Sequence, residues 1–345
     1  MAAVAVGVTP GRAPTLYDVA RVAGVSRQTV SNAMNAPDRL HAHTLARVRD
    51  AIDGLGYVPN RTARSLRHQT SRLIGYRVMP FDPVLTSPIL DRFLHALTDS
   101  ARREGYLVVL FTPADEQDEL STYAELRRTG AVDGFVLSDI ERRDERAQFL
   151  LELGAPFVSF GKTGLRRPHP WVDVDGAAGT AAAVQYLAGR GHERIAFIGW
   201  PAGSRPGDDR LAGWRRAMTD AGLAFPSSLV ARAAHGVEEG ARAAAHLLDR
   251  RQPPTAIVCA CDTFAMGCLA ECRSRGVTVG DDVAVVGFDD SPAAALVSPP
   301  LTTVSQPVEE VARTIVRMLT TRLAGAEGGA THRLIEPTLV VRESA

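Results

Sequence analysis

The hydrophobic residues of this chain follow two patterns, which change near residue 72. Up to residue 56 they recur at helical spacing, and from residue 73 onward short apolar runs typical of buried strands alternate with longer helical patterns. The helical runs are Leu16, Val19, Ala20 and Ala23; Val30, Ala33 and Met34; and Leu45, Val48, Ile52 and Leu55. The pattern predicts a small all-α module followed by a large α/β domain.

Residues that begin and end helices divide the N-terminal module. The hydroxyls of Thr15 and Ser26 can cap the first and second helices, Gly24 permits the turn between them, and Gly56 ends the third. The apolar residues of the second helix share a face that can pack on the first helix. We expect its opposite face to carry Arg27, Gln28, Ser31 and Asn32. This arrangement is typical of a helix-turn-helix.

The polar face of the second helix has the chemistry needed to recognise DNA. Arg27 and Gln28 lie at its start, and their side chains can form paired hydrogen bonds with guanine and adenine in the major groove. Ser26, Thr29 and Asn35 can bind phosphate oxygens. The alternative is a solvated helix face on another kind of bundle, because generic helix-turn-helix matches include many false positives.

Positive charge is concentrated in the same part of the chain. From Thr15 to Gly75 there are nine arginines and four acidic residues, a balance of +5 in a chain whose net charge is zero. Residues 61–67 contain three of these arginines in a segment too short to form a stable helix alone. We expect this segment to order on DNA. The charge distribution fits a cationic DNA module on a mildly acidic sensor.

The α/β region contains two series of strand-like runs separated by helical patterns. The first series comprises residues 73–79, 107–111, 134–137 and 156–160, and the second comprises residues 171–174, 195–199, 229–231, 256–260 and 283–288. Two such series predict two lobes with doubly wound parallel sheets. Because ligands bind beyond the carboxyl ends of parallel strands, the residues that follow the strands are candidates for binding. They include Met79, Asp139, Trp200, Asp262 and Asp289.

A dense set of short motifs runs through the N-terminal module without gaps. They are Thr15-Leu16-Tyr17-Asp18-Val19-Ala20, Ala23-Gly24-Val25-Ser26, Thr29-Val30-Ser31, Asn35, Gly56-Tyr57, Pro59-Asn60 and Ala63-Arg64-Ser65-Leu66. Together they resemble the DNA-binding headpiece and hinge of the lactose-repressor (LacI/GalR) family. The resemblance implies a homodimer whose recognition helices enter successive major grooves of a pseudo-palindromic operator. It places the base contacts at Arg27, Gln28 and Asn32.

The resemblance also assigns roles outside the recognition helix. It implies a minor-groove wedge at Leu66 and a small residue at Ala63 that lets two hinge helices approach each other. The chain departs from the family at His41, where serine or threonine is common, and at Asn32, where arginine is common. The first change weakens a helix cap and the second alters the preferred bases. The implied phosphate contacts are Thr15, Tyr17, Ser26, Thr29, Asn35, Asn60 and Arg61.

Looser motifs extend the resemblance to the C-terminus. They are Val172-Asp173-Val174-Asp175, Gly191-His192-Glu193-Arg194-Ile195, Arg210-Leu211-Ala212-Gly213-Trp214, Cys261-Asp262, Val286-Gly287-Phe288-Asp289-Asp290, and Leu301-Thr302-Thr303-Val304 with Gln306. These are similar to the family's sensor domain, which resembles periplasmic sugar-binding proteins. The resemblance implies an effector held between the lobes, with Arg210 and Asp289 contacting it. Cys261 stands where asparagine is common, so one polar contact is expected to be missing or supplied elsewhere.

The chemistry of a sugar site fits several of these residues. Such a site needs charged groups that bind neighbouring hydroxyls, and an aromatic side chain against the sugar ring. The candidate effector-binding residues are Arg210, Asp289, Trp200, Asp139, Cys261, Gln306 and Met79. Structural alternatives are that Asp289 caps a helix, that Arg210 pairs with Asp208 or Asp209, and that Trp200 is a core residue.

These observations predict a domain organisation. We expect a disordered tail at residues 1–14, the helix-turn-helix domain at 15–59, the hinge at 60–71 and the sensor at 72–345. Within the sensor we expect an N-lobe of residues 72–162 plus 307–330 and a C-lobe of residues 163–306 plus 331–345. The tail lacks the charge of a signal peptide, and no stretch approaches the roughly 20 apolar residues of a membrane span, so we expect a cytoplasmic protein.

All four cysteines lie between residues 259 and 272. We interpret them as buried core residues and not as a metal site, because no histidine follows at zinc-finger spacing. The chain also has no nucleophile elbow, dinucleotide fingerprint or phosphate loop. The sequence therefore predicts no metal, no cofactor and no enzymatic activity.

The leading hypothesis is a homodimeric transcriptional regulator that represses carbohydrate-use genes. Its expected partners are a double-stranded DNA operator and a small sugar, with no membrane. A nucleobase or nucleoside sensor on the same scaffold is an alternative that requires paired aromatic side chains. A transport-associated sugar-binding protein would require a secretion signal and no DNA module, and an enzyme would turn a substrate over.

Overall fold

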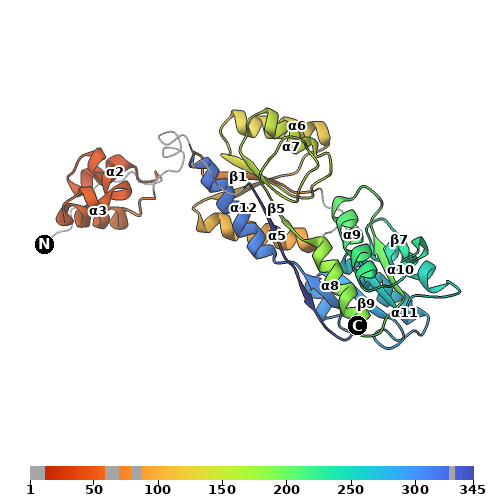
Figure 1. Ribbon diagram of the computed structural model, residues 1–345. Helices are drawn as coiled ribbons and strands as arrows, with labels where there is room; N and C mark the ends of the chain where they lie inside the picture. The colour runs from red at the N-terminus through yellow and green to blue at the C-terminus, as the bar shows by residue number, and fades with distance from the viewer. Residues whose placement is uncertain (1–11, 59–69, 80–87, 326–330) are drawn as a thin grey trace. The chain divides into compact units, whose positions relative to one another are not determined.

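In the computed structural model of this protein, the structure describes residues 12–58, 70–79, 88–325 and 331–345 (Figure 1). The chain divides into two compact units, Met1–Ser71 and Arg72–Ala345. Most of the predicted tail and most of the predicted hinge lie outside the described residues.

The first unit is a small helical bundle. It contains α1 (Leu16–Ala23), α2 (Arg27–Asn35) and α3 (Ala42–Leu55), with a 3₁₀ turn, η1 (Pro37–Arg39), between α2 and α3. Val19, Val30 and Val48, one from each α-helix, are completely buried against one another. Because each helix is too short to be stable alone, this shared apolar contact stabilises the bundle.

The predicted helix ends of this bundle are confirmed. Thr15 forms a capping box, in which its hydroxyl accepts a hydrogen bond from the Asp18 backbone while its own N–H donates to the Asp18 carboxylate at 2.9 Å. The Ser26 hydroxyl accepts a hydrogen bond from the Thr29 N–H at 3.1 Å. Gly24 and Gly56 both have φ of 60°, the left-handed conformation in which glycine avoids the steric cost of a side chain.

One prediction about α2 is wrong, because Ser31 does not lie on the solvent-exposed face. Only 6% of its surface is exposed. The Asn35 side chain folds back over it and donates hydrogen bonds to the Ser31 carbonyl at 2.8 Å and to its hydroxyl at 3.3 Å. Ser31 is therefore at the flank of the helix, where its small size permits close packing.

The second unit is built on two six-stranded sheets. The strand order is β11-β5-β4-β3-β1-β2 in the sheet that defines the N-lobe and β12-β10-β9-β8-β6-β7 in the sheet that defines the C-lobe. Among the described pairings all are parallel except β10 with β12. The predicted pair of doubly wound parallel sheets is confirmed.

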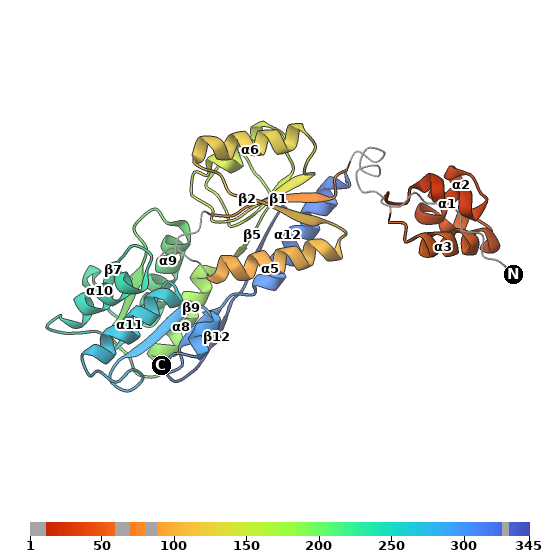
Figure 2. The same ribbon diagram turned by 180° about the vertical axis from the view of Figure 1, so that it is seen from behind.

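The N-lobe helices cover both faces of its sheet. Figures 1 and 2 show α5 and α12 on one face and α6 and α7 on the other. The strands are β1 (Leu73–Arg77), β2 (Leu107–Phe111), β3 (Gly134–Leu137), β4 (Phe157–Phe160), β5 (Trp171–Val174) and β11 (His332–Ile335), and the helices are α5 (Pro88–Arg103), α6 (Glu116–Arg128), α7 (Glu145–Glu152) and α12 (Val308–Leu323).

The C-lobe repeats this arrangement. Its strands are β6 (Ile195–Gly199), β7 (Val230–Arg232), β8 (Ala256–Cys259), β9 (Ala284–Asp289), β10 (Thr302–Ser305) and β12 (Thr338–Val340). Its helices are α8 (Gly176–Gly189), α9 (Arg205–Asp220), α10 (Val237–Leu248) and α11 (Asp262–Ser274), with 3₁₀ turns η2 (Ser227–Leu229) and η3 (Pro292–Ala295).

The predicted boundaries between the lobes are wrong at two strands. We assigned residues 171–174 and 331–345 to the C-lobe, whereas β5 and β11 pair with each other in the N-lobe sheet, and only β12 joins the C-lobe. The chain therefore changes lobe after Val174, after Ser305 and after Ile335. The order of strands along the chain does not reveal these changes. Which sheet a strand joins depends on the strands with which it forms hydrogen bonds, and these can be distant in the sequence.

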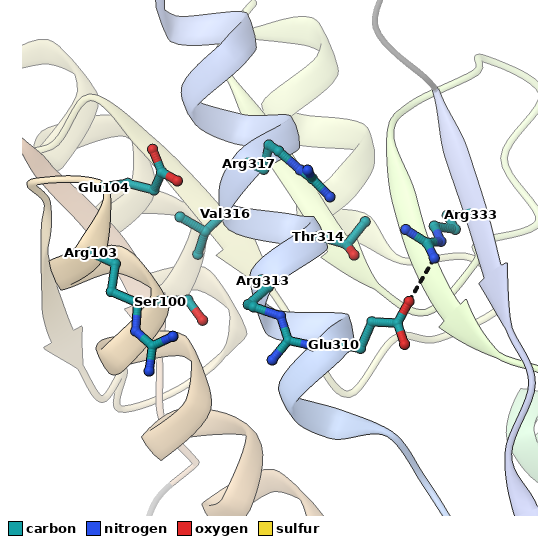
Figure 3. A pocket seen from close by; sticks show the side chains of 9 residues that line it. All are labelled: Ser100, Arg103, Glu104, Glu310, Arg313, Thr314, Val316, Arg317 and Arg333. Carbon is teal, nitrogen blue, oxygen red and sulfur yellow. Dashed lines mark hydrogen bonds and ion pairs between the residues drawn. The ribbon is translucent and has the colours of Figure 1, made fainter.

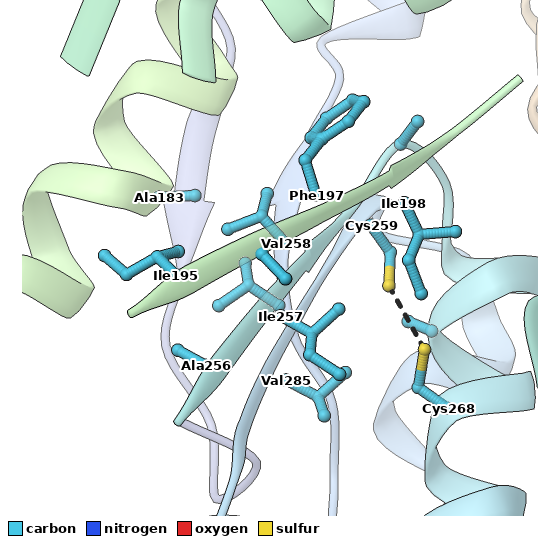
Figure 4. Close-up of a cluster of buried hydrophobic side chains, with 14 of the residues drawn as sticks. Ala183, Ile195, Phe197, Ile198, Ala256, Ile257, Val258, Cys259, Cys268 and Val285 are labelled. Carbon is cyan, nitrogen blue, oxygen red and sulfur yellow. Dashed lines mark hydrogen bonds between the residues drawn. The ribbon is translucent and has the colours of Figure 1, made fainter. Parts of the chain in front are cut away.

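Glycines allow the C-lobe helices to pack closely. A Cβ at Gly213 of α9 would collide with the backbone of Ala177 in α8, and one at Gly240 of α10 would lie 2.6 Å from the carbonyl oxygen of Phe264 in α11. Sheet and helices enclose a large apolar core, part of which is shown in Figure 4.

Cys259, Cys261 and Cys268 belong to that core, and Cys272 is also buried. All four cysteines are buried free thiols, which confirms the predicted burial, and the sulfurs of Cys259 and Cys268 are 3.5 Å apart (Figure 4).

Candidate functional site

The first candidate site is the exposed face of α2. Arg27 and Gln28 lie in its first turn with exposed side chains, and the Gln28 amide donates a hydrogen bond to the Asn32 amide oxygen at 2.9 Å. This hydrogen bond links two of the predicted base-contacting residues. Tyr17, on α1, is 63% exposed.

Several predicted phosphate contacts already have structural partners. The Thr15 hydroxyl donates to the Asp18 carboxylate at 2.6 Å, and the Ser26 and Thr29 hydroxyls are 2.9 Å apart. These groups organise the helix N-termini, whose free N–H groups can bind an anion. The predicted contacts at Asn60, Arg61, Ala63 and Leu66 lie outside the described residues.

Two details of the bundle concern its helix ends. His41 is the N-cap of α3 and makes no capping hydrogen bond with its side chain, as its difference from serine or threonine predicts. Arg47 of α3 donates to the carbonyls of Ala23 and Gly24, at 2.5 and 3.2 Å, and so ties α3 to the turn before α2. No sequence pattern indicates these Arg47 hydrogen bonds, because they join residues that are 24 and 23 positions apart.

The second candidate site lies at the carboxyl ends of the C-lobe strands. Arg210 of α9 places Nη2 3.8 Å from Oδ1 of Asp289, which ends β9. Gln306, which follows β10, donates a hydrogen bond to the same oxygen at 2.6 Å. Arg210 also donates to the carbonyl of Ala260, immediately before Cys261. Four of the predicted effector-binding residues are thus brought together from separate elements.

Burial controls the electrostatics of this cluster. The Asp289 side chain is only 13% exposed, and burial raises its pKa to about 7, although the nearby Arg210 opposes the rise. Burial also lowers the pKa of the Arg210 guanidinium. The buried Nε of Arg210 has no hydrogen-bond partner within the described residues. A buried donor without a partner costs free energy, so a ligand that accepts this hydrogen bond would stabilise the site.

Aromatic side chains surround the guanidinium of Arg210. Its central carbon lies 3.7 Å from the ring centre of Phe288 and 5.5 Å from that of Trp200. The Trp200 ring is stacked on His235 at an interplanar angle of 10°, and its indole N–H donates to Nδ1 of His235 at 3.3 Å. His235 was not predicted from the sequence, because it follows the short strand β7 in a segment without a motif.

Asp262 has a structural explanation. Its carboxylate accepts hydrogen bonds from the Ser291 N–H at 2.7 Å and from the Thr303 hydroxyl at 2.6 Å, and only 2% of the residue is exposed. It therefore ties the start of α11 to the ends of β9 and β10.

The remaining two effector candidates lie in the N-lobe. Asp139, which follows β3, is exposed with φ of 52°, and Met79, which follows β1, is 47% exposed. The Met79 sulfur contacts the guanidinium of Arg77. Neither residue makes a hydrogen bond or ion pair with the C-lobe cluster in the part of the chain that the structure describes.

A buried network of charges lies close to these two residues. Arg77 and Arg146 flank Glu119, with nitrogen–oxygen distances of 3.0 and 3.8 Å, and Arg146 also pairs with Asp144 at 2.5 Å. Burial raises the pKa of Glu119. Arg146 donates to the Asp139 carbonyl at 2.8 Å, so the network fixes the backbone at the end of β3.

A helix-turn-helix unit and a two-lobed α/β domain with polar groups at its strand ends define a DNA-binding transcriptional regulator with a periplasmic-binding-protein-like sensor. Comparison with known proteins agrees. Residues 15–60 match the description "Bacterial regulatory proteins, lacI family", and residues 184–345 match "Periplasmic binding protein-like domain". The chain is 35% identical over 339 residues to the HTH-type transcriptional regulator CelR of Thermobifida fusca, covering 96% of this chain and 98% of that protein. This protein belongs to the lacI family of bacterial regulatory proteins.

Solved structures give the same result. The structure of a transcriptional regulator CelR–cellobiose complex is similar with a TM-score of 0.73 and 33% identity, covering 96% of this chain and all of that one (100%). The lac repressor dimer bound to operator and an anti-inducer is similar with a TM-score of 0.81 and 27% identity, covering 96% and 99%.

None of the helices in the described residues is long and apolar enough to cross a membrane. Within residues 12–58, 70–79, 88–325 and 331–345, no three His, Cys, Asp or Glu side chains are grouped so that they could hold a metal ion.

Proposed function

We propose that this protein binds a pseudo-palindromic DNA operator as a homodimer and represses carbohydrate-use genes until a small sugar binds its sensor. The exposed Arg27 and Gln28 at the start of α2, with Asn32 hydrogen-bonded to Gln28, support base contacts by these three residues. A dimer is required because one recognition helix contacts too few base pairs for useful specificity. The similar lac repressor structure is a dimer on its operator.

The observation that carries the sugar assignment is the cluster of Arg210, Asp289 and Gln306. A carboxylate, a guanidinium with an unpartnered Nε and an amide lie together, and each can bind sugar hydroxyls. Trp200 provides an aromatic face beside them. Asp139 and Met79 are proposed to contribute from the N-lobe side of the effector. Cys261 contributes no hydrogen bond comparable to that of an asparagine, so Gln306 is the proposed source of the amide contact.

A nucleoside effector is less well supported. It would need two aromatic rings with space for a base between them, whereas Trp200 and His235 are hydrogen-bonded to each other and already in contact. Cellobiose is the first sugar to test, because the similar CelR structure is named as a cellobiose complex.

The test uses fluorescence anisotropy with DNA selected from a random pool. Operator affinity of the full-length protein is measured with and without cellobiose and a panel of other mono- and disaccharides. We expect one sugar to weaken operator binding, because a ligand that prefers one lobe arrangement shifts the equilibrium between arrangements.

The Asp289→Ala variant tests whether Asp289 binds the sugar or only supports the fold. The assay is run at about pH 8, above the pKa of about 7 of Asp289, so that the carboxylate is ionised. Loss of a hydrogen bond to a buried charge costs about 1.5–3 kcal/mol, so sugar affinity should fall roughly 10- to 150-fold while operator binding without sugar is unchanged. Asp281→Ala, a matched change at an exposed aspartate before the same strand, should respond as the wild type does. An equal sugar response in the wild type and Asp289→Ala would contradict the proposed site.

A further inference from the structure

A groove on the N-lobe lies between elements that are far apart in the sequence. It is formed by the C-terminal part of α5, by α12 and by β11 (Figure 3), and this open groove has a volume of about 330 Å³. Arg103, Arg313, Arg317 and Arg333 line it, together with Glu104 and Glu310. The lining therefore carries two more positive than negative charges. It contains none of the proposed effector-binding residues, all of which lie elsewhere.

Nearby acidic groups are already paired with arginines, and two of those arginines line the groove: Arg333, and Arg103, which pairs with Asp99 at 2.7 Å. Glu309 forms a two-pronged ion pair with Arg92, with both nitrogen–oxygen distances 2.9 Å. Glu310 accepts a hydrogen bond from Arg333 at 2.6 Å, drawn as a dashed line in Figure 3. In the described part of the chain Arg313 and Arg317 form no ion pair and no hydrogen bond through their guanidinium groups. These two positive charges are one helical turn apart, a spacing that is unfavourable unless an anion lies between or beside them.

Two buried residues of the lining carry hydroxyl groups. They are Ser100 of α5 and Thr314 of α12, which are only 6% and 5% exposed. Within the described residues neither side chain is hydrogen-bonded to another group. Hydroxyl groups in the same groove as arginine side chains can donate to an oxyanion.

We propose that this groove is a second ligand site, which binds a small molecule carrying a phosphate monoester. Guanidinium groups bind phosphate oxygens in pairs with matching planar geometry, and all four cations here are arginines. The volume of the groove lies within the range of small-molecule pockets. Figure 3 shows Arg313 and Arg317 one above the other on α12, with Arg333 on the neighbouring strand β11. A phosphorylated sugar can place its phosphate between these arginines and its hydroxyls against the rest of the lining.

The first measurement is isothermal titration calorimetry of the full-length protein at constant ionic strength. Inorganic phosphate and glucose 6-phosphate are the probes, and glucose is the neutral control. We expect saturable binding of glucose 6-phosphate with one site per chain, weaker binding of inorganic phosphate and no binding of glucose at this site. Absence of saturable binding by both anions would overturn the proposal. Tighter binding of inorganic phosphate than of glucose 6-phosphate would also overturn it, because the sugar would then contribute nothing.

Variants locate the site. Arg313→Gln and Arg317→Gln should each weaken glucose 6-phosphate binding by about tenfold or more, since each removes a charge-assisted contact. Arg322→Gln makes the same change at an exposed arginine of α12 outside the groove, and its dissociation constant should stay within about twofold of the wild type. Equal weakening by all three variants would indicate general electrostatic attraction and refute a built site.

The same titration distinguishes this groove from the proposed sugar site. Asp289→Ala should leave glucose 6-phosphate binding unchanged, because Asp289 belongs to the C-lobe cluster. If Asp289→Ala abolishes glucose 6-phosphate binding and Arg313→Gln does not, the phosphorylated sugar binds at the C-lobe cluster and the groove assignment is wrong. That result would leave the proposed regulator function intact.

Discussion

From the raised pKa of Asp289 we predict how the folding stability of the sensor changes with pH, without knowing the effector. Burial raises this pKa from 3.8 to about 7 in the folded protein. Between these two values the folded protein retains a proton on Asp289 that the unfolded chain has released. Folding therefore takes up a proton, and raising the pH through this window destabilises the folded state.

Asparagine at this position removes the titration while keeping the shape of the side chain. Integrating the proton linkage from pH 5 to pH 8 with the two pKa values predicts that the free energy of unfolding of the wild type falls by about 2.5 kcal/mol. Asp289→Asn should not show this loss. For a domain of this size the difference corresponds to about 5–10 °C in melting temperature. The wild type should therefore lose stability relative to Asp289→Asn as the pH rises.

The assay is thermal unfolding at pH 5, 6, 7 and 8, followed by tryptophan fluorescence. All three tryptophans, Trp171, Trp200 and Trp214, belong to the second unit, so the signal reports the sensor and not the helix-turn-helix unit. Asp281→Asn, at an exposed site, controls for the general loss of a negative charge. If the difference in melting temperature between the wild type and Asp289→Asn stays constant over this pH range, the reasoning is refuted, because Asp289 would then be ionised throughout.

The remaining predictions concern DNA binding and packing. Arg27→Ala should weaken operator binding by about 1–3 kcal/mol and reduce the discrimination between bases at one position, as measured by anisotropy on single-base operator variants. An equal loss of affinity on all DNA sequences would mean that Arg27 contacts only phosphate. Leu66→Ala should weaken operator binding without lowering the melting temperature of the sensor, and a lower melting temperature would contradict a role in the minor groove. Gly213→Ala should destabilise the sensor by about 1–3 kcal/mol in chemical denaturation because its Cβ would collide with α8, whereas Gly189→Ala, with open space around it, should be neutral or stabilising by up to about 1 kcal/mol. The four buried cysteines should not react with a water-soluble thiol reagent until the protein unfolds, and rapid labelling of the native protein would place a thiol at the surface.

The helix-turn-helix was predictable because its signals are local. Thr15, Ser26, Gly24 and Gly56 act on backbone groups within a few residues, so their effect is visible in the order of amino acids. The same is true of the alternating strands and helices of the sensor. Ser31 was misplaced because it lies at the edge of the apolar face, where the fold of the Asn35 side chain decides its exposure.

The candidate effector residues were predictable as a set but not in their arrangement. Arg210, Asp289 and Gln306 stand in motifs, yet their contacts join residues 17 or more positions apart. His235, and the arginines that line the groove between α5, α12 and β11, do not belong to any sequence motif. They could be recognised only once helices and strands from distant parts of the chain lay side by side.

The sequence by itself therefore determined the class of each element and the family, since hydrophobic period, caps and motifs are properties of neighbouring residues. The tertiary structure alone decided which lobe β5 and β11 join, and that burial brings Asp289 close to neutrality. The physical reason is the same in both cases. Strand pairing and the free energy of a buried charge depend on what surrounds a residue in space, and those surroundings come from remote segments of the chain.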